Sequence, residues 1–321
     1  MKTIKVKIRT LTPLWTGDAD RKCSKIKETG IIGSLRWWYE ALVRGLGGYA
    51  CDPTSEKRCK LDQKKFQKAI KDGKSIQEAL DEQICPACQL FGCTGWSRGF
   101  RLEINGVHPD DIEKGSGPMA GLMSNSVFYF NFILDSVFLS YLNSEQKWLL
   151  KKTLWIIENY GAIGGRTTWK PDGGWGTDYG LIKIENYGEI RKWDSLLEMN
   201  QVKNWLEKNK RKLEKENDYE WFNFKFYWIV KGRYLNRQQM NKTVKRDPNT
   251  GRYTRNAGEF DRWLGGEIGT TKKIFSFKNQ KKVFGYVRNL EEIKEIRRRL
   301  ESVLYHSINF RTGEEILEEL K

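Results

Sequence analysis

A glycine-rich segment at residues 161–176, GAIGGRTTWKPDGGWG, holds the residue types best suited to contact a phosphate chain. Six of its sixteen positions are glycine, which permits positive φ angles and lets backbone amides approach phosphate oxygens closely. Arg166 and Lys170 add positive charge, and Trp169 and Trp175 add flat rings for base stacking. The pattern GxxxxGK[ST] is absent, which argues against a nucleoside triphosphate enzyme. The segment is therefore a candidate contact with a nucleic acid, with an ordinary surface loop as the alternative.

The cysteines are the second group with recognisable chemistry. Cys85 and Cys88 have the two-residue spacing of a zinc knuckle, and Cys51 with Cys59 offers a second pair of thiolates. Seven residues separate Cys51 from Cys59, a wider gap than a usual knuckle has. These four residues are candidate ligands of a structural zinc ion, and a disulfide or plain buried thiols are the open alternatives. No other cofactor is expected. The C-x-x-C motif is not expected to catalyse redox chemistry, because it does not follow a strand as the thioredoxin motif does.

No set of residues predicts a catalytic centre. The two histidines, His108 and His306, lie far apart in the sequence, and an acid/base pair would need the fold to bring them together. Acidic pairs such as Asp18 with Asp20 are common in exposed loops that bind no metal. No nucleophile has an identifiable neighbouring base, so no catalytic residue is predicted.

The charge of the chain favours a polyanionic partner. The sequence has 57 Lys and Arg against 41 Asp and Glu, a net charge of +16. Residues 221–290 hold 16 of these cations against four acidic residues, interleaved with aromatic rings. The rings in this window are Trp221, Tyr227, Trp228, Tyr234, Tyr253, Trp263 and Tyr286. This mixture is typical of a single-stranded nucleic-acid surface, and a solvated basic face over a Trp-rich core is the alternative.

Six cations of this second half are equal candidates for RNA contact: Arg233, Arg237, Lys245, Arg246, Arg252 and Arg255. Residues 241–259, which hold four of the six, have no apolar periodicity, and we expect some of these cations to lie in a disordered loop. The charged loop that follows the first predicted strand adds Arg21 and Lys25 to the candidates.

Length and hydropathy define the class of protein. A chain of 321 residues suits two domains, and 39% hydrophobic with 31% charged residues is a globular composition. No run approaches the roughly 18 apolar residues of a membrane-spanning helix, and the start of the chain does not resemble a signal peptide. We therefore expect a soluble, cytoplasmic protein with no membrane partner.

Periodicity predicts the elements that position these residues. In the first half we expect, in order, a strand at 3–10, a helix from an N-cap at Ser34 to about residue 46, strands at 100–105 and 126–134, a helix at 145–160 and a strand at 179–186. A Cys-rich insertion at about 51–95, with a helix at 64–81, interrupts this order. In the second half we expect a helix at 193–216, strands at 222–231, 273–277 and 282–288, and a helix at 290–304 capped by Asn289 and Glu292.

The order strand, helix, strand, strand, helix, strand is the split βαβ pattern. The predicted fold class is therefore α+β, with two ferredoxin-like (RRM-like, split βαβ) domains with insertions. The predicted boundaries are 1–190 for the N-terminal domain and 191–321 for the basic C-terminal domain.

Several motifs of this chain resemble one family. LTPLWTG after the first strand, GSLRWWYEALVRGLGG, CDPT, CPACQLFGCTGW, the glycine-rich loop and KKVFGYVRN together resemble the RAMP superfamily proteins of CRISPR systems, within them the first RAMP subunit of the type III-B (Cmr) effector complex. The resemblance covers about the first 190 residues most strongly. It implies a non-catalytic subunit of an antiviral defence complex that binds single-stranded guide and target RNA beside other RAMP subunits, at the end distal to the guide 5′ tag.

The resemblance also implies particular contacts. The glycine-rich loop would touch RNA through Arg166, Trp169, Lys170 and Trp175, and the predicted first helix would add Arg36 and Trp37. The loop departs from the family pattern, a compact Gly-Arg-basic-basic-Gly run, because TTWKPD separates Arg166 from the next glycine.

Two alternative functions remain open for this sequence. One is a metal-independent riboendonuclease that processes guide RNA with a Tyr, Lys or His acid/base pair. The other is a structural capping subunit with little RNA affinity of its own, in which the exposed aromatic residues form protein interfaces.

Overall fold

The computed structural model describes residues 1–321 except 116–119, 136, 138, 140–141, 168–177, 196, 214–220, 269, 306 and 321. The elements of its first half are β1 (Lys2–Thr10), α1 (Glu28–Gly45), α2 (Gln63–Lys71), α3 (Ile76–Asp81), α4 (Pro86–Phe91), β2 (Phe100–Asn105), η1 (Pro109–Asp111), β3 (Ile112–Glu113), β4 (Gly121–Leu122), β5 (Val127–Leu134), α6 (Ser144–Asn159) and β6 (Ile182–Asn186). Those of its second half are η2 (Gly188–Lys192), α7 (Met199–Leu213), η3 (Phe224–Phe226), β7 (Tyr227–Lys231), α8 (Arg237–Thr243), α9 (Glu259–Gly265), β8 (Ile274–Phe277), β9 (Lys282–Tyr286), α10 (Leu290–Leu304), β10 (Asn309–Thr312) and α11 (Gly313–Glu318).

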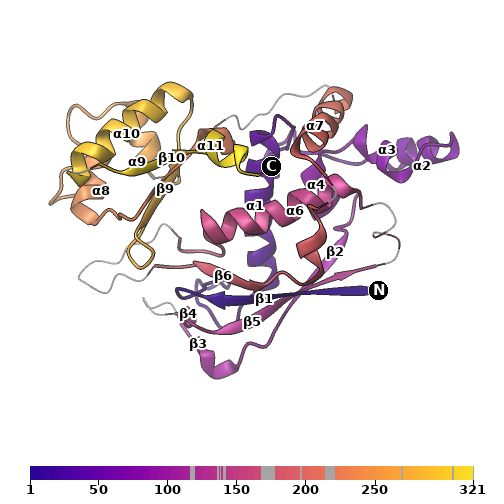
Figure 1. Ribbon diagram of the computed structural model, residues 1–321, viewed down its shortest axis with the longest axis horizontal. Helices are drawn as coiled ribbons and strands as arrows, with labels where there is room; N and C mark the ends of the chain where they lie inside the picture. The colour runs from indigo at the N-terminus through magenta and orange to yellow at the C-terminus, as the bar shows by residue number, and fades with distance from the viewer. Residues whose placement is uncertain are drawn as a thin grey trace.

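The first sheet has the order β2-β5-β1-β6, and each neighbouring pair in it is antiparallel. The alternation in β1 forms this sheet, because Ile4, Val6 and Ile8 are buried while the residues between them are more exposed. Helices α1 and α6 pack against each other and lie together on one side of the sheet (Figure 1). This order and helix placement are those of a ferredoxin-like βαββαβ unit, so the prediction for the first half is confirmed.

Helix α1 begins earlier than the sequence indicates. The predicted N-cap at Ser34 is wrong, because the helix starts at Glu28 and Ser34 lies within it. Ile31 and Ile32 are buried in the core, and this burial offsets the poor helix propensity of Gly30 and Gly33. Ser34 is thereby placed where its hydroxyl accepts a hydrogen bond from the Gly164 amide, at 3.2 Å.

The second sheet repeats the first, with the order β10-β7-β9-β8 and antiparallel pairs throughout. The predicted strands at 273–277 and 282–288 and the helix at 290–304 are confirmed as β8, β9 and α10. Asn289 caps α10 by accepting from the Glu292 amide, as predicted. The predicted strand at 222–231 is shorter, since residues 224–226 form a 3-10 turn in which Phe224 stacks on Tyr227 at 4.7 Å. The fold class is thus α+β with two ferredoxin-like sheets.

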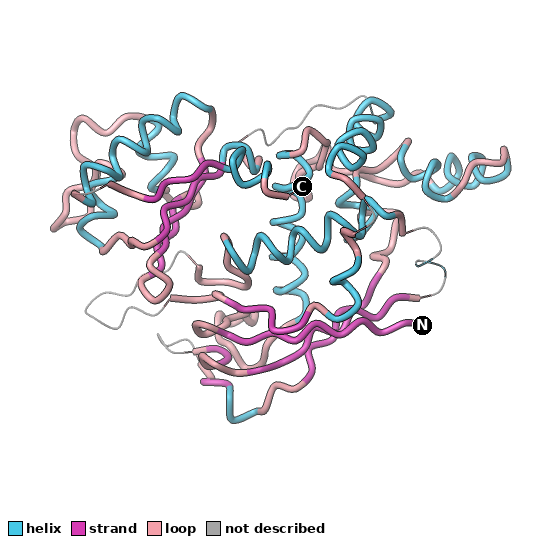
Figure 2. Tube along the Cα trace, in the orientation of Figure 1, coloured by secondary structure: helices cyan, strands magenta, loops and turns pink. Residues whose placement is uncertain are grey.

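Both faces of the second sheet are covered. Tyr227 and Ile229 of β7 belong to the large core shared with the first sheet, whereas Trp228 and Val230 pack in a separate core with α8, α9 and α10. Figure 2 shows these strands between the C-terminal helices and the first unit. Because β7 is buried on both sides, its sequence YWIVK has no polar alternation.

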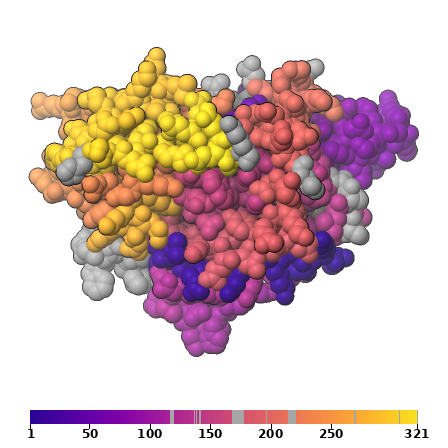
Figure 3. Space-filling view, viewed as in Figure 1, coloured from indigo at the N-terminus to yellow at the C-terminus, as the bar shows by residue number. Residues whose placement is uncertain are grey.

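Specific hydrogen bonds join the two units. The Tyr227 hydroxyl donates to the Tyr160 carbonyl at 2.7 Å, and the Lys282 ammonium donates to the Gly161 carbonyl at 2.8 Å. Figure 3 shows the C-terminal residues packed against the central part of the chain, with the α2–α3 segment projecting from the other end. The end of α6 and the start of the loop after it are therefore bonded to the second sheet.

The insertion and α7 pack on the first unit. The predicted helix at 64–81 is two helices, because Gly73 adopts a φ of +88° between α2 and α3. Helix α7 contacts α3 and α6, and the Asn209 amide donates to the Asp81 carbonyl at 3.1 Å. None of the helices in the described part of the chain has both the length and the apolar character that a membrane-spanning segment needs.

Candidate nucleic-acid interface

A cleft of about 560 Å³ opens between the first unit and the second sheet. One wall comes from the start of α1, the loop at 16–17 and the first described part of the glycine-rich loop. The other wall comes from residues 271–273 and the β8–β9 pair, with Trp221 at its side. The cleft therefore brings residues 16–38 and 162–167 close to residues 271–286, which follow more than a hundred positions later in the sequence.

Glycine keeps the first wall open. A Cβ atom built on Gly33, which lies on α1 and lines the cleft, would meet no atom within 4 Å. A Cβ on Gly165 would instead lie 2.6 Å from the Trp15 ring, and one on Gly161 would lie 2.6 Å from the Trp38 ring. Glycine is required at these two positions because the backbone passes directly against an indole.

The described part of the glycine-rich loop is rigidly anchored. The Gly165 amide donates to the Trp15 carbonyl at 2.8 Å, and the Trp38 indole donates to the Ala162 carbonyl at 2.8 Å. The Ile163 amide donates to the Gly180 carbonyl at 2.8 Å. The loop thus lies on the LTPLWTG segment and on α1.

Arg166 follows this anchored stretch and stacks on aromatic rings. Its guanidinium lies 4.5 Å from the centre of the Trp15 ring and 5.8 Å from that of Tyr179. Its backbone has a φ of +59°, a region that L residues other than glycine rarely adopt. The side chain is half-buried between the lining residues Gly165 and Thr167. The positive charge of Arg166 is therefore held against Trp15 and Tyr179, beside the cleft.

The second wall also carries positive charge. Lys272 is half-buried and lines the cleft. Lys273 is buried, and its ammonium lies 5.1 Å from the centre of the Trp221 ring and 5.3 Å from that of Trp263. Burial lowers the pKa of Lys273. Lys272 and Lys273 therefore give this wall of the cleft its positive charge.

Aromatic rings form the floor between these cations. Trp37 packs 5.5 Å from Tyr286 and 4.3 Å from Phe222, measured between ring centres. Trp221 packs 5.5 Å from Trp263. Trp37, Trp221 and Tyr286 line the cleft together with Phe275 and Phe284. A floor of packed rings with cations at two rims is the arrangement that binds unpaired bases and their phosphates.

Comparison with known proteins identifies the family. The family model of the RAMP superfamily matches residues 7–169, which is half of the chain and runs from β1 into the glycine-rich loop. The chain belongs to the RAMP superfamily. No curated protein matches the sequence.

Thirteen chains of solved structures match this RAMP protein. One of them belongs to a cryo-EM structure of the type III-B Cmr-beta complex bound to cognate target RNA and AMPPnP in the presence of ssDNA. Its identity to this chain is 12% and its TM-score is 0.43, over 94% of this chain and 98% of that chain.

The structure separates the predicted contact residues of this RAMP protein into groups. Trp37 lines the cleft, and Arg166 lies between two residues that line it, Gly165 and Thr167. Trp169, Lys170 and Trp175 lie outside the described residues. Sequence reasoning did not single out Trp15, Lys272 or Gly33, although LTPLWTG and the lysine pair at 272–273 were visible signals.

The exposed cations Arg21 and Lys25 project from a loop that follows the lining residues Thr16 and Gly17. Asp18 organises this loop, because its carboxylate accepts from the Ser24 amide and hydroxyl and pairs with Lys27 at 2.5 Å. The Lys27 and Ser24 hydrogen bonds lower the pKa of Asp18 to about 2. The loop is thus ordered at neutral pH with its cations exposed beside the cleft.

Arg36 has a different role from the one predicted. Its guanidinium donates to Glu40 at 2.7 Å, to the Gly92 carbonyl at 2.9 Å and to the Cys88 sulfur at 3.3 Å. These contacts point the side chain into the protein, on a different side of α1 from Trp37. Arg36 therefore braces the Cys-rich insertion.

The basic stretch from Arg233 to Arg255 does not line the cleft. Its exposed cations are Arg233, Arg237, Lys242, Arg252 and Arg255. Lys245 pairs with Asp261 at 3.3 Å, and Arg246 donates to the Gly266 carbonyl at 2.6 Å. The expectation of a disordered loop at 241–259 is wrong, because Asp247 accepts turn bonds from the Asn249 and Thr250 amides and a β-bridge joins Arg246 to Tyr253.

Three of the predicted stacking residues are core residues. Tyr227, Trp228 and Tyr286 are at most 1% exposed. They are buried because the second sheet is covered on both faces. Tyr286 alone of these three reaches the lining of the cleft.

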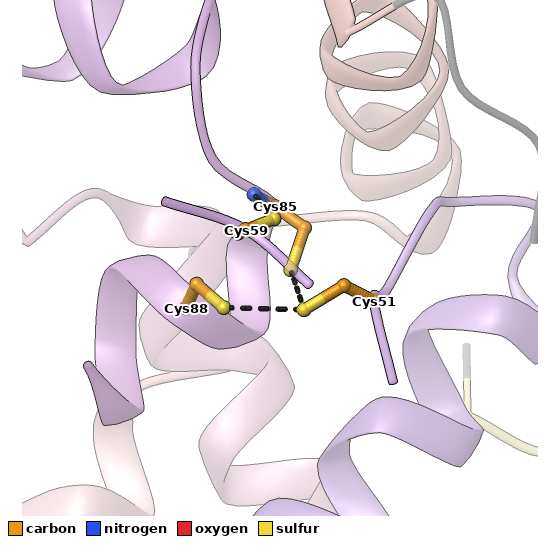
Figure 4. Close-up of side chains that lie close together, drawn as sticks. All are labelled: Cys51, Cys59, Cys85 and Cys88. Atoms are coloured by element: carbon orange, nitrogen blue, oxygen red, sulfur yellow. Dashed lines mark hydrogen bonds between the residues drawn. The ribbon is translucent and has the colours of Figure 1, made fainter. Parts of the chain in front are cut away.

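The four candidate zinc ligands come together. Cys51, Cys59, Cys85 and Cys88 are all buried, and their sulfur atoms all lie within 4.8 Å of one another. Figure 4 shows the four side chains pointing toward a common centre. The contacts of Arg36 with Cys88 place this cluster beside α1, away from the cleft floor.

Of the two histidines that a riboendonuclease could use, the structure describes only His108. His108 is exposed and caps η1, where its Nδ1 accepts from the Asp110 amide at 3.4 Å. His306 lies outside the described residues.

Proposed function

We propose that this RAMP protein binds single-stranded RNA in the cleft between its two sheets, as a non-cutting subunit of a CRISPR type III-B effector complex. The observation that carries the proposal is a floor of packed rings in a cleft that Lys272 and Lys273 line on one wall and the loop around Arg166 lines on the other. Membership of the RAMP superfamily and the net charge of +16 support it.

The shape and chemistry of the cleft favour an unpaired strand. A volume of about 560 Å³ suits one or a few bases, and a duplex keeps its bases stacked where such rings cannot reach them. Stacking contributes roughly 1–3 kcal/mol per base and tolerates any sequence. Phosphates at the two rims would supply the salt-dependent part of the affinity.

The position within a complex rests on sequence motifs. The resemblance to the first RAMP subunit of type III-B complexes suggests a place distal to the guide 5′ tag, next to other RAMP subunits. Guide and target strands are both candidate ligands, and the cleft recognises the feature they share, an unpaired sugar-phosphate chain with accessible bases.

A salt titration with charge-matched variants tests the proposal. The affinity of the purified chain is measured for single-stranded RNA, duplex RNA and single-stranded DNA, in EDTA, and the RNA is sized afterwards. The variant Arg166→Gly with Lys272→Ala removes one cation from each rim, and glycine suits the positive φ at position 166. The control Lys64→Ala with Lys68→Ala removes equal charge from exposed positions of α2, at the opposite end of the molecule from the second sheet (Figure 1).

The proposal predicts intact RNA, a preference for single strands and a log-log salt slope that falls by about 1.4 in the cleft variant, since each phosphate contact of a single strand contributes about 0.7. The control should keep the wild-type slope. Equal slopes in both variants would contradict the cleft as the RNA site. Discrete cleavage products would favour the riboendonuclease, and absence of binding at moderate salt would favour the capping subunit.

A further inference from the structure

We propose that Cys51, Cys59, Cys85 and Cys88 bind one structural zinc ion that fixes the Cys-rich insertion to α1. The inference concerns a site separate from the RNA cleft and does not depend on RNA binding. The four sulfur atoms lie within 4.8 Å of one another and all four residues are buried.

The spacing of the sulfur atoms fits a single tetrahedral ion. Zinc–sulfur bonds of about 2.3 Å in a tetrahedron place the sulfur atoms about 3.8 Å apart. The Cys51 sulfur lies 3.4 Å from that of Cys88 and 3.9 Å from that of Cys85. A small rearrangement therefore completes the coordination sphere (Figure 4).

The ligand set is chemically selective. Four thiolates are soft ligands, and a closed S₄ set is typical of structural zinc. All six cysteines of the chain carry free thiols, so the four are available as ligands. A single disulfide would bond only two of the four sulfur atoms and would leave the other two as buried thiols beside it. One zinc ion would engage all four sulfur atoms.

The surrounding donors suit negatively charged sulfur. The Cys85 amide donates to the Cys59 sulfur at 3.4 Å, and Arg36 donates to the Cys88 sulfur at 3.3 Å. Such N–H donors stabilise thiolates in the shell around a metal. Arg36 is itself held by Glu40 on the next turn of α1.

The backbone delivers the cysteines from three separate segments. Arg44, buried on α1, donates to the Ala50 and Cys51 carbonyls at 2.8 and 3.2 Å and fixes the loop that carries Cys51. The Leu61 amide donates to the Thr94 carbonyl at 2.8 Å, which holds the Cys59 segment beside the loop after α4. Cys85 occupies the N-cap of α4, with Pro86 in its first turn and Cys88 two residues further along. An ion would thus cross-link the Cys51 loop, the Cys59 segment and α4, and the hydrogen bonds of Arg44 and Arg36 would tie this unit to α1.

Metal analysis of the full-length wild-type protein tests the inference. We expect about one zinc per chain, released by a thiol-reactive mercurial, with an X-ray absorption shell of four sulfur atoms at about 2.3 Å. Cys51→Ser and Cys88→Ser should each lower the zinc content to near zero. Cys93→Ser should keep it, because Cys93 is outside the set of four.

The wild-type measurements stand even where a cysteine variant fails to fold. Metal-free protein from zinc-containing medium, iron in place of zinc, nitrogen or oxygen in the coordination shell, or full zinc content in Cys51→Ser would each overturn the assignment. Salt-dependent RNA binding by a zinc-free chain would leave the proposed function intact, so the two claims fail separately.

Discussion

At the scale of single residues, tryptophan explains why the first wall of the cleft is rich in glycine. Trp15 lies against Gly165 and under Arg166, and Trp38 lies against Gly161. The sequence predicted close backbone approach at these glycines, but to phosphate. The structure shows that two of them first accommodate indole rings, which the spacing of residues in the sequence could not reveal.

The protonation of the buried residue Lys282 makes the stability of the fold depend on pH. It lies on β9, is 6% exposed and donates to the Gly161 carbonyl. Burial, with repulsion from Lys231, lowers the pKa of Lys282 from 10.5 to about 7. The unfolded chain therefore binds one more proton than the folded chain between about pH 7 and pH 10.5.

This difference predicts that the free energy of unfolding rises with pH across that window, by up to about 1.4 kcal/mol per pH unit from Lys282. This gain in stability is lost as the pH falls from 10.5 through 7. Chemical denaturation of wild type and Lys282→Met from pH 6.5 to 9.5 measures it. The difference between the two curves should grow with pH. The neighbouring Lys281→Met, at an exposed position, should follow wild type, and parallel curves for Lys282→Met would refute the argument.

At the scale of elements, α1 joins the two sites of the molecule. Trp37 faces the cleft, while Arg36 and Arg44 face the Cys-rich insertion. Gly33 on the same helix faces the open cleft. Replacing it adds helix propensity, roughly 0.5–1 kcal/mol, and places a side chain where the RNA is proposed to lie.

Gly33→Leu should therefore keep or raise the melting temperature and weaken single-stranded RNA binding by about fivefold or more, a loss of about 1 kcal/mol. Gly33→Ala should show the same gain in stability with a smaller loss of affinity. Thermal denaturation and RNA titration of both variants check this. A Gly33→Leu protein with wild-type affinity would show that the cleft is not used.

The elements were more predictable from the sequence than their contacts. The alternation of Ile4, Val6 and Ile8 identified β1, and the capping pair Asn289 and Glu292 identified α10. The start of α1 was missed because burial of Ile31 and Ile32 outweighs local propensity. Aromatic residues of the second half were ambiguous, since a ring in a core and a ring in a binding site have the same local pattern.

At the scale of the whole molecule, the cleft exists only because the two ferredoxin-like units pack together. Arg166 follows α6 of the first unit and Lys272 precedes β8 of the second, so their approach depends on how the sheets pack. The shared core and the bonds from Tyr227 and Lys282 fix that packing. No sequence pattern encodes this juxtaposition, which is why the second rim of the cleft was not predicted.

Photocrosslinking of 4-thiouridine-labelled single-stranded RNA to the full chain, followed by mass spectrometry of the crosslinked peptides, would locate the RNA site. RNA bound in the cleft should crosslink to both walls, in peptides that contain Trp37 or residues 161–167 and in peptides that contain Trp221 or residues 271–275. Crosslinks confined to residues 233–255, or to α2 and α3, would contradict binding in the cleft.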